Sequence, residues 1–226
     1  MKKINIAIDG PAGAGKSTVA KLVAKSLNYI YIDTGAMYRA LTFKAIELGI
    51  DLNNQNLLND YLKNHSIELI NEGGFQRVEV DGINISDKIR TPEVSNNVSL
   101  VSSHPLVRKT MVEIQKNLAI DSNVVMDGRD IGTNVLPNAE IKIFLTASIG
   151  ERARRRYTEL LEKGYDANLE NIKNEIALRD KKDQERLINP LKMADDAILL
   201  DTSSLTIGQV VEKILDTVKE KVGGKK

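Results

Sequence analysis

The chain has 226 residues, of which 42% are hydrophobic and 28% charged; it carries a formal net charge of +1 and no cysteine. These values are typical of one globular domain and exclude a disordered chain, a disulfide scaffold and thiolate metal sites. The balanced charge and the lack of an apolar run of ~20 residues predict no nucleic-acid partner and no membrane partner. Because Asn5 and Asp9 interrupt the first apolar segment, we expect no signal peptide and a cytoplasmic location.

The first predicted element is a glycine-rich turn between a strand at residues 4–8 and a helix at residues 15–27. Residues 10–17 read Gly-Pro-Ala-Gly-Ala-Gly-Lys-Ser, which matches the P-loop pattern G-x-x-x-x-G-K-S. Its backbone N–H groups would cradle phosphates, Lys16 would reach the β- and γ-phosphates, and the Ser17 hydroxyl would bind Mg²⁺. The predicted ATP site consists of Gly10, Pro11, Ala12, Gly13, Ala14, Gly15, Lys16, Ser17 and Thr18.

The middle of the chain breaks the strand–helix alternation with an antiparallel insert. A strand at residues 29–32, a helix at 36–48 and a short helix near 57–62 come before it. Residues 66–85 alternate apolar and polar side chains around turns at Glu72-Gly73-Gly74 and Asp81-Gly82, which predicts a small meander. Helices at residues 91–102 and 105–119 follow it.

The last third of the chain returns to alternation. Strands are predicted at residues 124–127, 141–145 and 197–201, helices at 148–161, 169–179 and 207–222, and a frayed end at 223–226. Five strands alternating with helices predict an α/β fold with a five-stranded parallel sheet wound on both faces, of the P-loop kinase type. We expect a single domain over residues 1–226, with an inserted subdomain at 60–100 and a helical lid at 150–186.

Two strand exits carry reactive side chains, and ligands of such a sheet bind beyond these ends. Residues 33–39 read Asp-Thr-Gly-Ala-Met-Tyr-Arg, where Arg39 would suit a phosphate, although an ordinary capped helix with a solvated arginine also fits. The strand at residues 124–127 ends in Asp127, which is typical of a Walker-B carboxylate that holds Mg²⁺, with Arg129 and Asp130 beside it. An Asp-Gly turn with a structural ion pair is the alternative.

A third cluster is basic and lies between the fourth and fifth strands. Its members are Arg152, Arg154, Arg155, Arg156, Arg179 and Arg186. They form either a solvated helix face or a lid that closes over phosphates. Because phosphoryl transfer needs cations around the moving group, we expect catalytic roles for the following five side chains. They are Lys16, Arg129, Arg152, Arg156 and Arg179.

Four segments together resemble the bacterial cytidylate kinase family. They are residues 10–18, 33–39, 127–132 (Asp-Gly-Arg-Asp-Ile-Gly) and 179–186 (Arg-Asp-Lys-Lys-Asp-Gln-Glu-Arg). The resemblance covers nearly the whole chain, including the inserted meander. It implies that the γ-phosphoryl group of MgATP is transferred to CMP or dCMP, giving ADP and CDP or dCDP. It also implies that the insert belongs to the monophosphate-binding region and helps to close over the base.

The resemblance implies an acceptor site as well. Cytosine or its surroundings would be contacted by Thr34, Ser99, Arg108 and Asp130, the sugar hydroxyls by Asp183, and the phosphate region by Tyr38, Arg39, Arg129 and Arg186. Thr34 stands where a serine is also familiar and keeps the hydroxyl. Ser99 and Arg108 rest on local context rather than on a dense motif. Ser17 and Asp127 would hold Mg²⁺, the one expected cofactor.

Three other functions stay open at this point. A kinase for another nucleoside monophosphate, such as UMP or AMP, would use the same chemistry. A GTPase switch would normally carry an Asn-Lys-x-Asp segment, and none occurs. A structural nucleotide-binding module would leave the arginine clusters without a purpose. We expect a monomer, and no essential carboxylate base, because a phosphate monoester with a second pKa of ~6 is already largely ionised at neutral pH.

Overall fold

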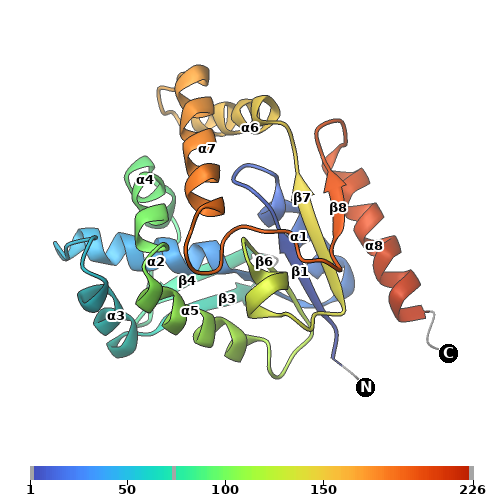
Figure 1. Cartoon of the computed structure of the whole chain (residues 1–226), viewed down its shortest axis with the longest axis horizontal. Helices are drawn as coiled ribbons and strands as arrows, with labels where there is room; N and C mark the ends of the chain where they lie inside the picture. Colours follow the sequence, from blue (N-terminus) through green and yellow to red (C-terminus); the bar gives the residue numbers. More distant parts are fainter. Residues whose placement is uncertain (1–2, 73–74, 224–226) are drawn as a thin grey trace.

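The centre of the computed structural model, which describes residues 3–72 and 75–223, is a parallel sheet of five strands (Figure 1). These are β1 (Asn5–Asp9), β2 (Ile30–Asp33), β6 (Val124–Gly128), β7 (Ile141–Thr146) and β8 (Ile198–Asp201), in the order β2-β6-β1-β7-β8. In the register of central β1, Asn5 pairs with Val124 and Ile6 with Ile141. The predicted parallel sheet is confirmed, and each observed strand end lies within one residue of the predicted one.

Helices cover both faces of the sheet, and successive side chains of β1 point to opposite faces. Helices α1 (Lys16–Leu27) and α8 (Ile207–Gly223) pack on Ile6 and Ile8. On the other face, Ala7 packs in a cluster with Val112 of α5 (Pro105–Leu118) and Ile131 of a π-helical turn, Ile131–Val135. This period of two is what a strand buried on both faces requires.

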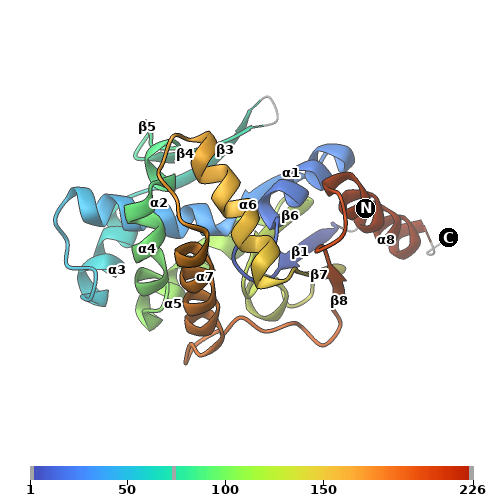
Figure 2. The same ribbon diagram turned by 90° about the horizontal axis from the view of Figure 1, so that it is seen from above.

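The segments from α2 to α4 lie beside the sheet (Figure 2) and share one apolar core with α5 (Pro105–Leu118). They are α2 (Thr34–Glu47), α3 (Gln55–Asn64), β3 (Ile67–Glu72), β4 (Phe75–Val80), β5 (Ile83–Asn84), a 3₁₀ turn at Lys88–Arg90 and α4 (Pro92–Val101). The bounds of the predicted insert, residues 60–100, stay a prediction. The predicted meander is confirmed, since β3, β4 and β5 form an antiparallel sheet. Asp81 and Gly82 both have positive φ, as the mirror-image hairpin turn demands. The predicted turn at Gly73-Gly74 and the predicted fraying of residues 224–226 lie outside the described residues.

The segment predicted as a lid contains α6 (Ile149–Glu162) and α7 (Leu169–Gln184), which pack against each other near the carboxyl end of the sheet (Figure 1). Helix α7 runs five residues beyond the predicted end at Arg179. Its last turns are polar and show no apolar period, yet Asp180 and Asp183 are buried there. Within the described part of the chain, no helix is long and apolar enough to cross a bilayer.

Candidate active site

The P-loop after β1 depends on glycines with positive φ. Gly10, Gly13 and Gly15 have φ values of 146°, 75° and 87°, a region that other residues rarely adopt. A Cβ atom on Gly10 would lie 2.0 Å from the carbonyl oxygen of Leu145, so a side chain does not fit there. The loop therefore has the curled backbone that directs N–H groups toward an anion.

Lys16 is folded back into this loop. It opens helix α1, and its Nζ donates a hydrogen bond of 2.8 Å to the carbonyl oxygen of Pro11. Burial, and then the positive charge of Arg129, lowers the pKa of Lys16 well below its ordinary value. A polyphosphate beside Lys16 would favour the charged form again, so the loop and its lysine suit a strongly anionic ligand.

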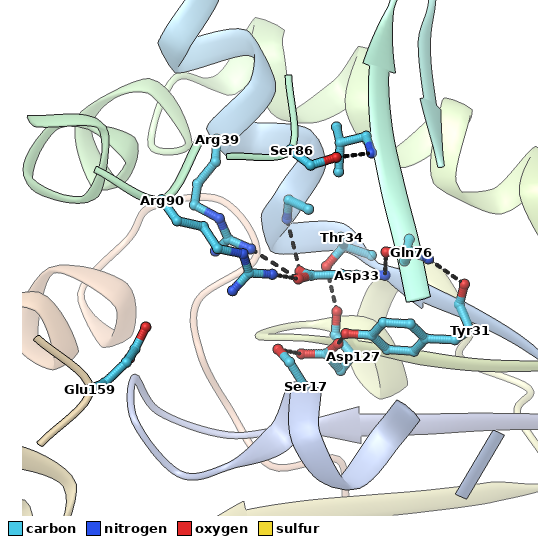
Figure 3. A network of polar contacts seen from close by, with 12 residues as sticks. Ser17, Tyr31, Asp33, Thr34, Arg39, Gln76, Ser86, Arg90, Asp127 and Glu159 are labelled. Atoms are coloured by element: carbon cyan, nitrogen blue, oxygen red, sulfur yellow. Dashed lines mark hydrogen bonds and ion pairs between the residues drawn. The ribbon is translucent and has the colours of Figure 1, made fainter. Parts of the chain in front are cut away.

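Asp127, at the end of β6, is buried between two hydroxyl groups (Figure 3). Ser17 Oγ donates to its Oδ2 at 3.0 Å, and the hydroxyl of Tyr31 donates to its Oδ1 at 2.8 Å. Burial, and then the negative charge of Asp33, raises the pKa of Asp127 to about 6. The predicted pair of Ser17 and Asp127 is thus assembled, and Tyr31 holds its second oxygen.

The donor set of Ser17 and Asp127 fits Mg²⁺. A hydroxyl and a carboxylate are hard oxygen ligands, and Mg²⁺ in kinases usually takes one or two protein oxygens together with substrate phosphates. Among the described residues no group of three or more His, Cys, Asp and Glu side chains could hold a metal alone. This combination favours a metal that arrives with a nucleotide over a metal caged by the protein.

The exit of β2 gathers two arginines on one carboxylate. Asp33 Oδ2 accepts from Arg39 Nη2 at 2.9 Å and from Arg90 Nη2 at 3.2 Å (Figure 3). Its Oδ1 caps helix α2 by accepting from the backbone N–H of Ala36 at 2.8 Å. Burial alone would raise the pKa of Asp33, but Arg39 and Arg90 outweigh it and hold the pKa below its ordinary value. Two cations on one anion leave net positive charge at this exit.

Thr34 holds the backbone of the site in place in this structure. Its hydroxyl donates to the backbone carbonyl oxygen of Asp127 at 2.7 Å, and the residue is buried. A Cβ atom on Gly128 would lie 2.6 Å from the same hydroxyl, which explains the glycine after Asp127. The predicted contact between Thr34 and the base stays a prediction.

The exit of β6 is joined to the end of α7. Arg129 Nε donates to Asp183 Oδ2 at 2.9 Å, and Arg186 Nη2 lies 3.1 Å from Asp183 Oδ1. Burial would raise the pKa of Asp183, but Arg129, Arg186 and Arg179 outweigh it, and its pKa is lowered. Burial, and then Arg129, lowers the pKa of Arg179 to about 10. Three arginines from two distant segments therefore surround one carboxylate.

A second buried ion pair joins α5 to the segment after β6. Arg108 Nη2 donates to Asp130 Oδ2 at 2.6 Å, and its guanidinium carbon lies 5.7 Å from the ring centre of Tyr38. Arg108 also donates to the carbonyl oxygen of Ser102 at 3.1 Å. Ser99 lies one helical turn before Ser102 on α4 and is half-buried. Of the predicted base-contacting residues, Arg108 and Asp130 are thus brought together from distant parts of the chain, and the contacts of Ser99 and Thr34 with the base stay predictions.

Several buried polar atoms around these pairs have no hydrogen-bond partner among the described residues. They include Tyr38 Oη, Arg39 Nε, Arg108 Nε and Arg179 Nε. A buried donor without a partner is unfavourable, by about 1–3 kcal/mol. These four atoms belong to predicted site residues, and other unpartnered atoms, on Asn5 and Gln115, lie outside the predicted site. The concentration of donors at the acceptor side favours a ligand with several acceptor oxygens, such as a phosphate.

The comparison with protein families then decides the assignment. A family model described as cytidylate kinase matches residues 6–220. The chain belongs to the cytidylate kinase family. Cytidylate kinases of Bacillus cereus (strain B4264) and Bacillus thuringiensis (strain Al Hakam) are 58% and 57% identical over 217 residues, covering 96% of this chain and 96% of each relative. A solved shikimate kinase from Acinetobacter baumannii shares the fold, with a TM-score of 0.50, 15% identity and coverage of 99% of this chain and 96% of the other.

The lid arginines of this cytidylate kinase family member have different partners. Arg154 is exposed, and both it and Arg155 pair with Glu151; Arg155 also donates to the carbonyl oxygen of Thr202 at 2.8 Å. Arg156 pairs with Glu159 at 2.9 Å. Figure 3 shows Glu159 pointing from α6 toward the site. Arg152 is buried and bonded to the P-loop. Of the predicted catalytic side chains, Arg129 and Arg179 lie together, and Arg156 keeps only a half-exposed pairing that a ligand could replace.

Three residues of the site were not among the predicted ones. Asp9 accepts from the backbone N–H groups of Ile131 and Gly132 at 2.8 and 2.7 Å, and so orders the segment after Asp130. Tyr31 and Arg90 make the contacts described above. An acid at the end of β1, directly before the P-loop, was a local signal for Asp9. Arg90 gave no such signal, because its partner is far away in the sequence.

Proposed function

We propose that the protein transfers the γ-phosphoryl group of ATP to CMP or dCMP, giving ADP and CDP or dCDP. The observation that carries this proposal is the cluster of unpartnered, buried donors beside a P-loop, in a chain that belongs to the cytidylate kinase family. The P-loop accounts for one anionic ligand, and the donor cluster supports a second one. A switch or a structural module would need only the first.

The reaction follows from the arrangement of charge. An oxygen of the acceptor phosphate attacks the γ-phosphorus, the bond from that phosphorus to the bridging oxygen breaks, and ADP leaves. Two anions repel each other, so cations must neutralise both before they meet. Lys16 would serve the donor, and Arg39, Arg129, Arg179 and Arg186 the acceptor and the moving group. Mg²⁺, held by Ser17 and Asp127, would supply further neutralisation of the donor phosphates.

No carboxylate base is needed in this scheme, because the acceptor phosphate is largely ionised near neutral pH. The acidic side chains of the site instead hold arginines, as Asp33, Asp130 and Asp183 do. The proposal keeps the base contacts of Thr34, Ser99, Arg108 and Asp130 and the sugar contact of Asp183. It also keeps residues 60–100 as the monophosphate-binding unit, residues 150–186 as the lid, and a cytoplasmic monomer.

An acceptor panel tests the proposal. ATP and Mg²⁺ are incubated with CMP, dCMP, UMP, AMP, dTMP or shikimate, and ADP formation is measured. We expect stimulation by CMP or dCMP well above the other acceptors. Stimulation only by UMP or AMP would show that the acceptor is not CMP or dCMP. ADP release that is the same with every acceptor would refute the kinase assignment.

A further inference from the structure

In the P-loop, Ala12 forms hydrogen bonds with side chains of α6 and α7 through both its carbonyl oxygen and its N–H. Arg152 Nη1, on α6, donates to the carbonyl oxygen of Ala12 at 2.9 Å, and the N–H of Ala12 donates to Asp180 Oδ1, on α7, at 3.3 Å. Arg152 and Asp180 are themselves joined at 2.6 Å. Their side chains are 5% and 11% exposed, so this ion pair is shielded from solvent.

Arg152 also contacts the segment that precedes its helix. Besides Ala12 and Asp180, its Nε donates to the carbonyl oxygen of Ala147 at 2.9 Å. Through Nε and Nη1, the planar guanidinium thus spans three acceptors of the protein. These bonds fix the side chain of Arg152 against the P-loop, and its predicted catalytic role stays a prediction.

The P-loop sequence fits the close approach of α6. A Cβ atom on Gly13 would lie 3.1 Å from Cβ of Arg152, and the φ of Gly13 is +75°. A side chain there would be strained and crowded by the helix. Gly13 therefore lets the loop lie against α6.

Helix α7 contacts the acceptor side as well as the P-loop. Asp183 is three residues after Asp180, so both side chains lie on one face of the helix. Asp180 contacts the P-loop, while Asp183 contacts Arg129 and Arg186. Helix α7 thus contacts the two loops through different side chains, so a change at Asp180 leaves the contacts of Asp183 in place.

We propose that Arg152 and Asp180 are positioning residues whose ion pair clamps the P-loop at Ala12 in the shape that receives the donor phosphates. The clamp ties the donor loop to α7. The inference rests on the proposed function only for the identity of the two ligands.

The test measures donor and acceptor binding separately by calorimetry. MgADP is titrated into wild type, Asp180→Asn, Arg152→Lys and the control Arg154→Lys, which changes an exposed arginine on the same helix. We expect Asp180→Asn and Arg152→Lys to weaken MgADP binding by about 10- to 100-fold, because neither variant keeps the loop in place. CMP binding, titrated alone, changes by less than about 3-fold, and the control changes neither ligand.

A double-variant cycle adds a second readout. The single variant Arg152→Gln completes this cycle: if the pair acts as a unit, Asp180→Asn combined with Arg152→Gln weakens MgADP binding no more than the worse of these two single variants does. Additive losses, unchanged MgADP binding, or equal weakening of both ligands together with a lower Tm would each overturn the clamp. Arg152→Lys keeps the buried charges balanced, so it decides the question if Asp180→Asn does not fold. A wild type that binds MgADP without phosphorylating CMP would refute the proposed function alone.

Discussion

Two arginines at the acceptor side each bind a carboxylate through one nitrogen and leave another nitrogen without a partner. Asp33 binds Arg39 and Asp130 binds Arg108, while the Nε–H of each arginine lacks a hydrogen bond. The carboxylates offset the desolvation of the guanidinium groups before any ligand arrives. They also fix the orientation of the free nitrogens, which is the preorganisation that electrostatic catalysis requires.

Removal of either arginine that pairs with Asp183 should slow the reaction. We expect Arg129→Ala and Arg186→Ala to lower kcat/KM by roughly 10²–10⁴, because each removes a donor from the transferring group. Steady-state kinetics with CMP and ATP measure this loss. The exposed Arg154→Ala variant should stay near wild type, and near-normal turnover of both site variants would contradict the assignment.

The second residue-scale prediction concerns Asp9. Burial raises its pKa from 3.8 to about 6, although the N–H groups of Gly132 and Ile131 lower it in part. As the pH falls from about 6 to 4, the folded protein takes up a proton here before the unfolded chain does. The free energy of unfolding of wild type should therefore rise relative to Asp9→Asn, by about 3 kcal/mol at most.

Urea unfolding of both proteins between pH 4 and pH 7.5 checks this sign. The difference between the two curves isolates Asp9 from the other titrating groups, whose contributions are shared. A difference that shrinks on acidification would show that the folded-state pKa of Asp9 is not raised.

At the scale of elements, the insert is fastened to the edge strand of the main sheet by side-chain amides. Gln76 Nε2 donates to the carbonyl oxygen of Tyr31 at 2.6 Å, and Gln76 Oε1 accepts from the N–H of Asp33 at 3.2 Å. Asn71 donates to the same carbonyl at 3.1 Å. Since Asp33 orients Arg39, these amides connect the meander to the acceptor arginines.

Gln76→Ala should therefore weaken acceptor binding. Loss of two hydrogen bonds, each worth about 1 kcal/mol, predicts a rise in the Kd of CMP by roughly 3- to 10-fold, with MgADP binding unchanged. Calorimetry measures both constants. Arg77→Ala is the matched control, because the neighbouring side chain on β4 points to the other face and pairs with Glu72. Equal effects of the two variants would rule out a specific role of Gln76.

Elements with strong apolar periodicity could be predicted well, and those held by charge could not. The strands of the sheet and the hairpin at Asp81-Gly82 carry local signals, and the structure confirms them. The last turns of α7 and the π-helical turn at Ile131–Val135 are stabilised by Asp183 and Asp9, whose partners lie far away in the sequence. The P-loop could be predicted because it is contiguous. The pairing of Arg152 with Asp180 could not, because it depends on tertiary structure.

At the scale of the molecule, the acceptor side and the donor side rest on different cores. Helices α2 to α5 and the meander share one apolar cluster, and β1, β7, α1 and α8 share another.

A ligand that binds only the folded state adds stability by mass action, about 2.7 kcal/mol at 100 times its Kd. For a chain of this size each kcal/mol raises Tm by about 2–4 °C.

Thermal unfolding followed with CMP at 100 times its Kd should therefore show a Tm about 5–10 °C higher than that of the free protein. UMP at the same concentration should give a smaller rise if the base is recognised. A rise of equal size with both nucleotides would contradict the preference for cytosine.

The central position of β1 in the sheet affects the order in which parts of the chain fold during synthesis. Asn5 pairs with Val124, and Ile6 with Ile141, so both neighbours of the first strand come from the second half of the chain. During synthesis, the local elements of the insert can pack while β1 still waits for β6 and β7 to leave the ribosome. The P-loop, although translated first, should thus be among the last parts to reach its final shape, and a truncated nascent chain should lack a nucleotide site.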